Sequence, residues 1–153
     1  MSIERRYWDS NCFVAILNAD EAHSSNCVQI LDEAARGNLE IVVSTITMVE
    51  VVRPRGTGSP VPREIEDKIT AFFENDYIRM RLVDRLVAEK SRQLCWSENL
   101  HPRDAVHVAT AILESCEVLE SSDPHLLRLN GRIPNLEIRV PTWTGQTDLF
   151  KPS

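Results

Sequence analysis

The chain has 153 residues, of which 42% are hydrophobic and 26% are charged, and its formal net charge is −6. These totals fit one globular domain with its own hydrophobic core and argue against extensive disorder. They also argue against a protein that binds nucleic acid over its whole surface, but they do not exclude a local site.

No apolar run reaches the length that a bilayer-spanning helix needs. The N-terminal segment also lacks the apolar core of a secretory signal, because Asn11, Asn18, Asp20 and Glu21 interrupt it. The cysteines form no C-x-x-C pair, which agrees with a reducing compartment. We therefore expect a cytoplasmic protein with no membrane segment. Its thiols are expected to be reduced, buried and structural, at Cys12, Cys27, Cys95 and Cys116.

The first part of the chain predicts a strand followed by two helices. Residues 3–8 predict a short strand that ends at Asp9, and a helix follows through Leu17. A second helix starts near the polar residues 23–26, which supply N-cap candidates, and stops before Gly37.

The next segment predicts a buried strand, a helix and a long loop. Residues 40–44 are β-branched and apolar, as is typical of a parallel strand. Thr45 can cap the helix that follows, which places Glu50 about one and a half turns inside it. Residues 54–62 are rich in Pro and Gly and predict the longest loop of the chain. Long loops in compact domains often carry function.

The following segment predicts a helix, an outer strand and another helix. Residues 63–75 have a helical apolar pattern, whereas residues 77–83 alternate and indicate a less buried strand near a sheet edge. Asp84 can cap a helix that runs to about Glu98.

The last third predicts one more helix and two strands. Pro102 fits the first turn of a helix, and Asp104 lies near the N-terminus of that helix. Residues 117–122 predict a short strand that ends at Asp123, and residues 136–140 predict the last strand.

The alternation of strands and helices favours the α/β class, as a three-layer α/β/α domain with a mainly parallel central sheet. We expect this domain to span residues 1–141 and a C-terminal tail to span residues 142–153.

Four acids share one local setting, where a strand ends or a helix begins, although they lie far apart in the sequence: Asp9, Glu50, Asp104 and Asp123. In a parallel sheet such points gather at one edge, so these carboxylates could share one small volume. Like charges that close repel unless a cation or a proton joins them. The pattern predicts a divalent-metal site, for which metal-assisted phosphodiester chemistry is a natural use.

Each acid taken alone has a simpler explanation. Asp104 could be an ordinary helix-start acid, and Asp9 and Asp123 could cap helices or turns. Glu50 could lie on the solvent face of its helix. The four acids carry the metal hypothesis only when they are taken together.

Four segments resemble, in chain order, the motifs of PIN-domain ribonucleases, and most closely those of VapC-like toxins of toxin–antitoxin pairs: DSNCFVAIL, STITMVE, PRDAVHVATA and SSD. The resemblance runs from about Tyr7 to Leu127, and its specificity lies in the order and spacing of the segments. It implies an endoribonuclease that depends on Mg²⁺ or Mn²⁺ and cleaves RNA. It also implies a homodimer that is held by a cognate antitoxin protein.

The resemblance carries over residue by residue. The four catalytic acids of the family match Asp9, Glu50, Asp104 and Asp123. Among these acids, the metal ligands that the resemblance implies are Asp9, Asp104 and Asp123. Small polar residues of the family after the first acid, and a hydroxyl residue before the fourth, match Ser10, Asn11 and Ser121. These three side chains could orient water or an acid as outer partners.

Other side chains have weaker signals. His107 lies one helical turn after Asp104, where it could face the site or simply pack. His125 could touch RNA or be a plain surface residue. Trp96 and Trp143 could stack on bases, but packing in the core or against a partner is the simpler interpretation.

The basic loop after Glu50 suggests a further hypothesis, in which Arg53 and Arg55 guide the RNA backbone; the alternative is that both are solvated surface residues. The acidic balance of the chain suggests that a basic partner segment neutralises the site. Two other functions stay open. One is a non-catalytic or housekeeping PIN-type RNA-binding module, and the other is a metal-dependent DNA nuclease or phosphatase of the same architecture.

Overall fold

The computed structural model describes residues 3–19 and 21–143. In these residues one parallel sheet has the strand order β3-β2-β1-β4-β5. Its strands are β1 (Arg5–Trp8), β2 (Glu40–Ser44), β3 (Ile78–Arg81), β4 (Val118–Glu120) and β5 (Glu137–Arg139). The chain therefore builds outward from the central β1 to one edge and then returns to the other side of β1. The crevice beyond the carboxyl ends of β1 and its neighbours is a topological switch point, where α/β sheets commonly bind ligands.

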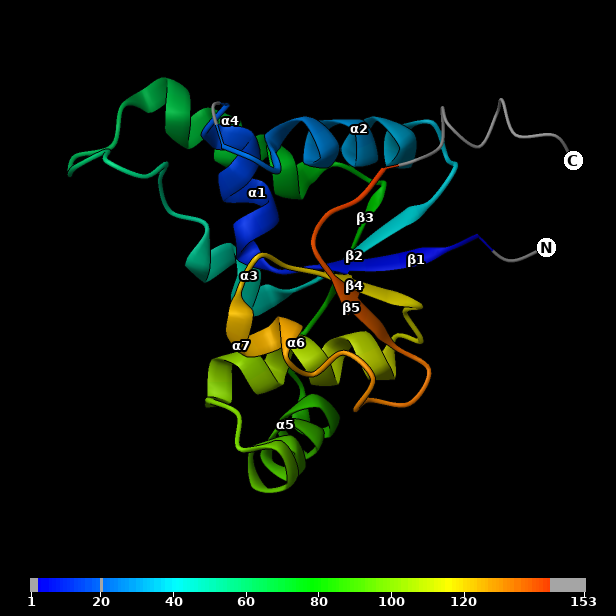
Figure 1. Ribbon diagram of the computed structural model, residues 1–153. Helices are drawn as coiled ribbons and strands as arrows, with labels where there is room; N and C mark the ends of the chain where they lie inside the picture. Colours follow the sequence, from blue (N-terminus) through cyan, green and yellow to red (C-terminus); the bar gives the residue numbers. More distant parts are fainter. Residues whose placement is uncertain (1–2, 20, 144–153) are drawn as a thin grey trace, which may run out of the picture.

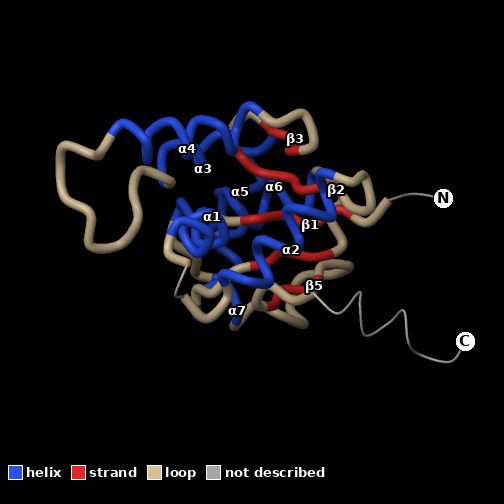
Figure 2. The backbone as a smooth tube through the Cα atoms, turned by 90° about the horizontal axis from the view of Figure 1, so that it is seen from above, coloured by secondary structure: helices blue, strands red, loops and turns tan. Residues whose placement is uncertain are grey.

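Helices cover both faces of the sheet and form the outer layers of a three-layer α/β/α domain (Figures 1 and 2). The helices are α1 (Ser10–Leu17), α2 (Ser24–Ala35), α3 (Thr45–Glu50), α4 (Arg63–Glu74), α5 (Arg85–Glu98), α6 (Pro102–Leu113) and α7 (Pro124–Leu127). In Figure 1, α1, α2 and α4 lie above the sheet, and α5, α6 and α7 lie below it. The α/β/α fold class predicted from the sequence is confirmed.

The core consists of two apolar clusters, one on each face of the sheet. Tyr7 belongs to the cluster packed under α5 and α6, and the next residue, Trp8, belongs to the cluster packed under α1, α2 and α4. Both side chains are fully buried. Successive residues of a strand point to opposite faces, so a strand that is apolar on both faces belongs in the middle of a parallel sheet.

Several local predictions are confirmed, and one is wrong. The strand near residues 77–83 lies at the sheet edge as β3, and the Asp84 carboxylate caps α5 by accepting from Val87 N at 2.9 Å. Thr45 does not cap α3. The Ser44 hydroxyl does so instead, accepting from Ile46 N at 3.2 Å. Helix α7 was not predicted, because four residues are too few to show a helical period.

The described start of the expected C-terminal tail contacts the domain. Thr142 N donates to the Glu120 carboxylate at 3.1 Å, and the Arg6 guanidinium carbon lies 5.7 Å from the ring centroid of Trp143. The expected packing of Trp143 is therefore observed. Residues 144–153 of the tail lie outside the described residues.

The remaining expectations concern surface and redox chemistry. Trp96 is 75% exposed, with Arg92 over its ring, so an interpretation of Trp96 as a core residue is wrong. All four cysteines are free thiols; one is half-buried and the others are buried. In the part of the chain that the structure describes, no helix is long and apolar enough to cross a membrane.

Candidate active site

The first group of site residues gathers where β1 and β4 end. The strand register pairs Trp8 with Glu120, so the residues that follow them, Asp9 and Ser121, leave the sheet side by side. The Ser121 hydroxyl donates to Asp9 Oδ2 and accepts from Asp123 N at 2.9 Å. One buried hydroxyl thus connects two of the predicted acids.

Asp9 and Asp123 also cap helices. Asp9 Oδ1 accepts from Asn11 N at 3.0 Å at the start of α1, and Asp123 Oδ1 accepts from His125 N at 2.9 Å at the start of α7. The capping explanation from the sequence is therefore correct, and it is compatible with a site role. A cap fixes the carboxylate in one rotamer and leaves lone pairs for other partners.

Burial makes Asp9 an unusual carboxyl group. Its side chain is almost fully enclosed, at 3% exposure, and this desolvation raises the pKa of Asp9 to about 6. The nearby charge of His107 and the hydrogen bond from Ser121 act in the opposite direction, while the charge of Asp123 raises the pKa further. Asp9 therefore carries a negative charge that the described residues compensate only in part, and a cation beside it would favour the ionised form.

A second group connects α3, α6 and β1. The last residue of α3, Glu50, has its Oε1 2.7 Å from His107 Nε2, and His107 Nδ1 lies 2.5 Å from the Tyr7 hydroxyl oxygen. The Nε2 nitrogen is the partner of Glu50, and the Nδ1 nitrogen is the partner of the Tyr7 hydroxyl, so the ring uses both of its nitrogens. His107 is buried, so this chain of hydrogen bonds fixes the direction of the Glu50 side chain.

The electrostatics keep Glu50 ionised. Burial alone would raise the pKa of Glu50, but the hydrogen bond and charge of His107 outweigh it and, together with Arg103 and Ser10, lower the pKa below its ordinary value. Burial raises the pKa of Tyr7 well above its ordinary value, and the charges of Asp9 and Glu50 add to this shift. The Tyr7–His107–Glu50 chain therefore lies within electrostatic reach of the Asp9 cluster.

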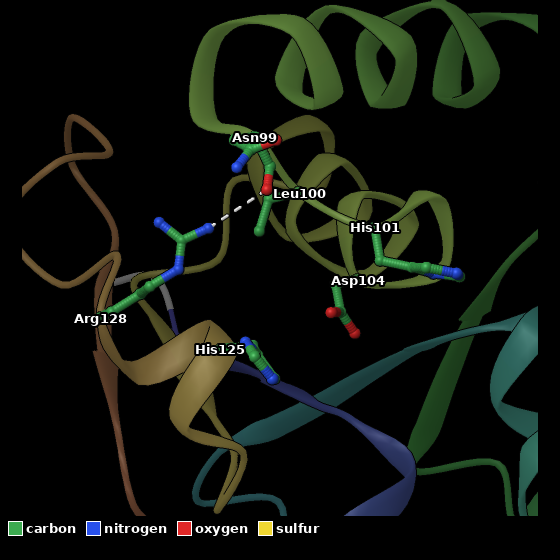
Figure 3. Close-up of a pocket in the computed structure, with 6 residues that line it drawn as sticks. All are labelled: Asn99, Leu100, His101, Asp104, His125 and Arg128. Atoms are coloured by element: carbon green, nitrogen blue, oxygen red, sulfur yellow. Dashed lines mark hydrogen bonds between the residues drawn. The ribbon is translucent and has the colours of Figure 1, made fainter.

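Asp104 lies in different surroundings. It occupies the first turn of α6 and is half-buried, and it lines a pocket of about 510 Å³ together with residues of the α5–α6 connection and of the α7 segment (Figure 3). Within residues 3–19 and 21–143 its carboxylate makes no hydrogen bond or ion pair. Asp104 therefore presents a free carboxylate to the pocket.

The other predicted site residues have separate environments. Ser10 interacts with Glu50, and Asn11 reaches Asp9 through its backbone N–H. Arg55 is engaged elsewhere, since its Nη2 lies 2.8 Å from Glu21 Oε1. Arg53 is exposed on the loop.

In the described part of the chain, no group of three or more His, Cys, Asp or Glu side chains is positioned to hold a metal ion. The physical reasons are visible: His107 engages Glu50, and Asp104 faces the pocket. The oxygen donors of Asp9 and Asp123 nevertheless suit a hard cation. Mg²⁺ needs only one or two direct carboxylates, because it keeps several of its waters.

Sequence reasoning missed two buried residues that shape the site. Glu120 is fully buried at the end of β4, where it accepts from Trp8 Nε1 at 2.9 Å and from Arg6 Nη1 at 3.0 Å. The backbone oxygen of Glu120 accepts from Cys12 Sγ, 3.3 Å away. Tyr7 is the other missed residue, as the partner of His107. An acid inside an apolar strand, and a hydroxyl-bearing aromatic two residues before Asp9, were the available signals.

Comparisons with known proteins agree with the fold. Three solved structures share the fold at low sequence identity. The VapC20 toxin of Mycobacterium tuberculosis, described as cleaving the sarcin-ricin loop, has a TM-score of 0.61 and 14% identity over 78% of this chain and 90% of its own. A toxin-antitoxin complex from Klebsiella pneumoniae has a TM-score of 0.57 and 19% identity, covering 86% and 94% of the two chains. VapBC2 from Rickettsia felis, bound to a promoter DNA fragment, has a TM-score of 0.60 and 17% identity, covering 88% and 96%.

No curated protein sequence matches the chain. The profile of the PIN domain family, in contrast, matches residues 6–132. This range includes all four predicted acids, and it includes β2, β3, β4 and all of β1 except its first residue. The chain belongs to the PIN domain family, and the resemblance seen in its motifs is confirmed.

Proposed function

We propose that this protein is an endoribonuclease that depends on Mg²⁺ or Mn²⁺, cleaves RNA phosphodiester bonds and is the toxin of a toxin–antitoxin pair. The observation that carries the proposal is the Asp9–Ser121–Asp123 cluster at the switch point, with a buried carboxyl group whose pKa is raised to about 6. Such a perturbed group in a crevice is typical of a functional site.

The donor set determines where a cation would bind. Asp9 and Asp123 would hold it through carboxylate oxygens, with Asp104 as the third proposed ligand from the pocket side. A bound divalent cation polarises a phosphoryl oxygen and makes water a nucleophile at neutral pH. Ser121 holds Asp9 in a fixed orientation through its hydroxyl hydrogen bond.

Glu50 is the proposed proton acceptor. His107 occupies Oε1, whereas the ion pair of Oε2 with Arg103 Nε is longer, at 3.7 Å. Oε2 can therefore accept a proton from the attacking water. The lowered pKa of Glu50 keeps it ionised at neutral pH, which is the state that a base requires.

The proposed partners follow from the similar structures and from the charge of the chain. Two of these structures contain toxin–antitoxin assemblies, and the third is a toxin that cleaves the sarcin-ricin loop. The net charge of −6 favours a basic segment of a cognate antitoxin over the acidic crevice. We propose that the protein is a cytoplasmic homodimer; light scattering of the purified chain measures its mass directly.

The test of the function is cleavage of mixed cellular RNA by partner-free protein with Mg²⁺, Mn²⁺ or EDTA. We expect the parent to cleave with either cation and not in EDTA, and the Asp9→Asn protein to be inactive. Asp67→Asn, an equivalent acid-to-amide change on the exposed side of α4, should cleave like the parent. Single-stranded DNA and a phosphomonoester, assayed in parallel, separate a ribonuclease from a DNA nuclease or phosphatase.

Two results would decide against the proposal. If folded parent protein cleaves no RNA with either cation, the chain is better described as a PIN-type RNA-binding module. If Asp9→Asn cleaves as fast as the parent, the activity belongs to a contaminant or to another site.

A further inference from the structure

The pocket beside Asp104 is built from two distant parts of the chain. The α5–α6 connection and the first turn of α6 form one wall, and α7 with the residue after it forms the other. The lining residues are Asn99, Leu100, His101, Asp104, His125 and Arg128. The volume of about 510 Å³ lies within the range of about 300–1,000 Å³ that is usual for small-ligand sites. The pocket therefore has room for a group as large as a nucleotide.

Arg128 is fixed in place by backbone oxygens. Its Nη2 donates to the carbonyl oxygens of Glu98 at 3.0 Å and of Asn99 at 3.4 Å, and Figure 3 shows the guanidinium reaching across to this connection. Among the described residues no carboxylate pairs with Arg128. A guanidinium has five N–H donors, so the remaining donors can bind a phosphate in the planar geometry that arginine favours.

His125 connects the pocket to the acidic cluster. Its backbone N–H donates to Asp123 Oδ1, so the residue is held on the same turn as the proposed cation ligand. Its side chain is exposed, and in Figure 3 it lies between Arg128 and Asp104. An imidazole in this position offers a flat face for stacking on a base and an N–H for hydrogen bonding.

The charges of the pocket restrict the ligand. Arg128 and Asp104 lie on opposite sides of it in Figure 3, so a simple anion such as free phosphate would be attracted by one wall and repelled by the other. A nucleotide fits better than free phosphate, because Arg128 can bind its phosphate and the exposed His125 ring can stack on its base.

We propose that this pocket is an RNA subsite that holds one unpaired nucleotide next to the bond to be cut, with its phosphate on Arg128 and its base against His125. The inference rests on the proposed ribonuclease function and names the residues by which the same site grips its substrate.

The experiment measures the binding of a fluorescein-labelled, single-stranded RNA decamer of mixed sequence by anisotropy. Every protein carries Asp9→Asn, and EDTA is present, so that no cleavage occurs. We expect Arg128→Ala and His125→Ala each to raise Kd about tenfold, as is usual for loss of a charge-assisted phosphate contact or a stacked base. Arg128→Lys should recover part of the loss, because lysine keeps the charge but not the planar fork.

Arg85→Ala is the matched control. It also removes an exposed arginine, which pairs with Glu89 on α5 and lies outside the pocket lining, and it should leave Kd within about twofold of the starting protein. Thermal unfolding of each variant monitors the fold. If Arg128→Ala unfolds because its backbone contacts are lost, the exposed His125 still provides the test.

Unchanged affinity in both His125→Ala and Arg128→Ala would overturn the subsite, as would an Asp9→Asn protein that does not bind the decamer at all. Cleavage assays in the active background separate this inference from the function. If the parent cleaves RNA and the pocket variants bind and cleave RNA as well as the parent does, the ribonuclease function is supported and the subsite proposal is wrong. If the parent never cleaves RNA but the pocket variants lose binding, the pocket binds RNA and the ribonuclease function is excluded.

Discussion

Asp9 and Asp104 were predicted as members of one acidic site, yet their surroundings are opposite. Asp9 is enclosed, caps a helix and accepts from Ser121. Asp104 is half-buried, faces the pocket and has no partner among the described residues. The enclosed acid is positioned by the protein itself, at the cost of a raised pKa, and the open acid is available to whatever enters the pocket. The difference divides the site into a preorganised half and a substrate-facing half.

The largest expected effect tests the cost of enclosing Asp9. The pKa of Asp9 is about 6 in the folded protein against an ordinary value of 3.8, so its contribution to stability is complete below about pH 4 and is lost as the pH rises through about 6. In EDTA, the free energy of unfolding of the parent minus that of Asp9→Asn should fall by up to about 3 kcal/mol between pH 4 and pH 8. Urea unfolding at each pH measures this difference. A difference that does not vary with pH would show that Asp9 is not desolvated.

The next effect tests whether the enclosed half depends on its hydroxyl connection. Ser121→Ala removes the donor to Asp9 and the acceptor for Asp123 N. It should lower the rate of RNA cleavage about 10- to 100-fold, as is usual when a residue that hydrogen-bonds to a metal ligand is lost. Ser91→Ala is the control. It removes another buried hydroxyl, one that donates only to Val87 O within α5, and its cleavage rate should match the parent. Equal activity of the two variants would contradict the role of Ser121.

A smaller effect separates the orientation of Glu50 from simple packing. His107→Ala removes the partner of Glu50 and one partner of the Tyr7 hydroxyl, so cleavage should fall about tenfold and stability by about 1–3 kcal/mol. Tyr7→Phe leaves the contact between His107 and Glu50 in place. It should lose about 1 kcal/mol of stability while cleaving like the parent. If both variants lose activity in proportion to stability, the chain of hydrogen bonds has only a structural role.

The smallest effect concerns the basic loop. Arg53 is exposed, whereas Arg55 pairs with Glu21, so only Arg53→Ala should reduce the salt dependence of RNA binding. The expected change in the slope of log K against log salt is about 0.7, the value for one phosphate contact on a single strand. An unchanged slope after replacement of both arginines would exclude the loop from RNA binding.

Local chemistry made much of the fold predictable. The apolar β-branched residues 40–44, the cap at Asp84 and the alternating edge strand are encoded in adjacent residues. The order of the acidic motifs predicted the family for the same reason, because each motif is short and continuous. Residues that act through neighbours in the sequence can be recognised without a structure.

The parts that could not be predicted depend on long-range pairing. Glu120 and Arg6 are 114 residues apart, and His107 and Tyr7 are 100 residues apart. The direction of Asp104 is also a tertiary property, because a first-turn acid of a helix can face a cluster or a pocket with the same local sequence. For this reason the sequence predicted the four acids but not their division into an enclosed and an open half.

The central claim is that the enclosed carboxylate at the switch point binds a divalent cation. Its most direct test is Mn²⁺ binding, followed by electron paramagnetic resonance, to the parent, Asp9→Asn and Asp67→Asn proteins. We predict that Asp9→Asn binds Mn²⁺ at least about tenfold more weakly than the parent, and that Asp67→Asn binds it equally well. Equal affinity in the parent and Asp9→Asn proteins would contradict the claim and place any bound cation elsewhere.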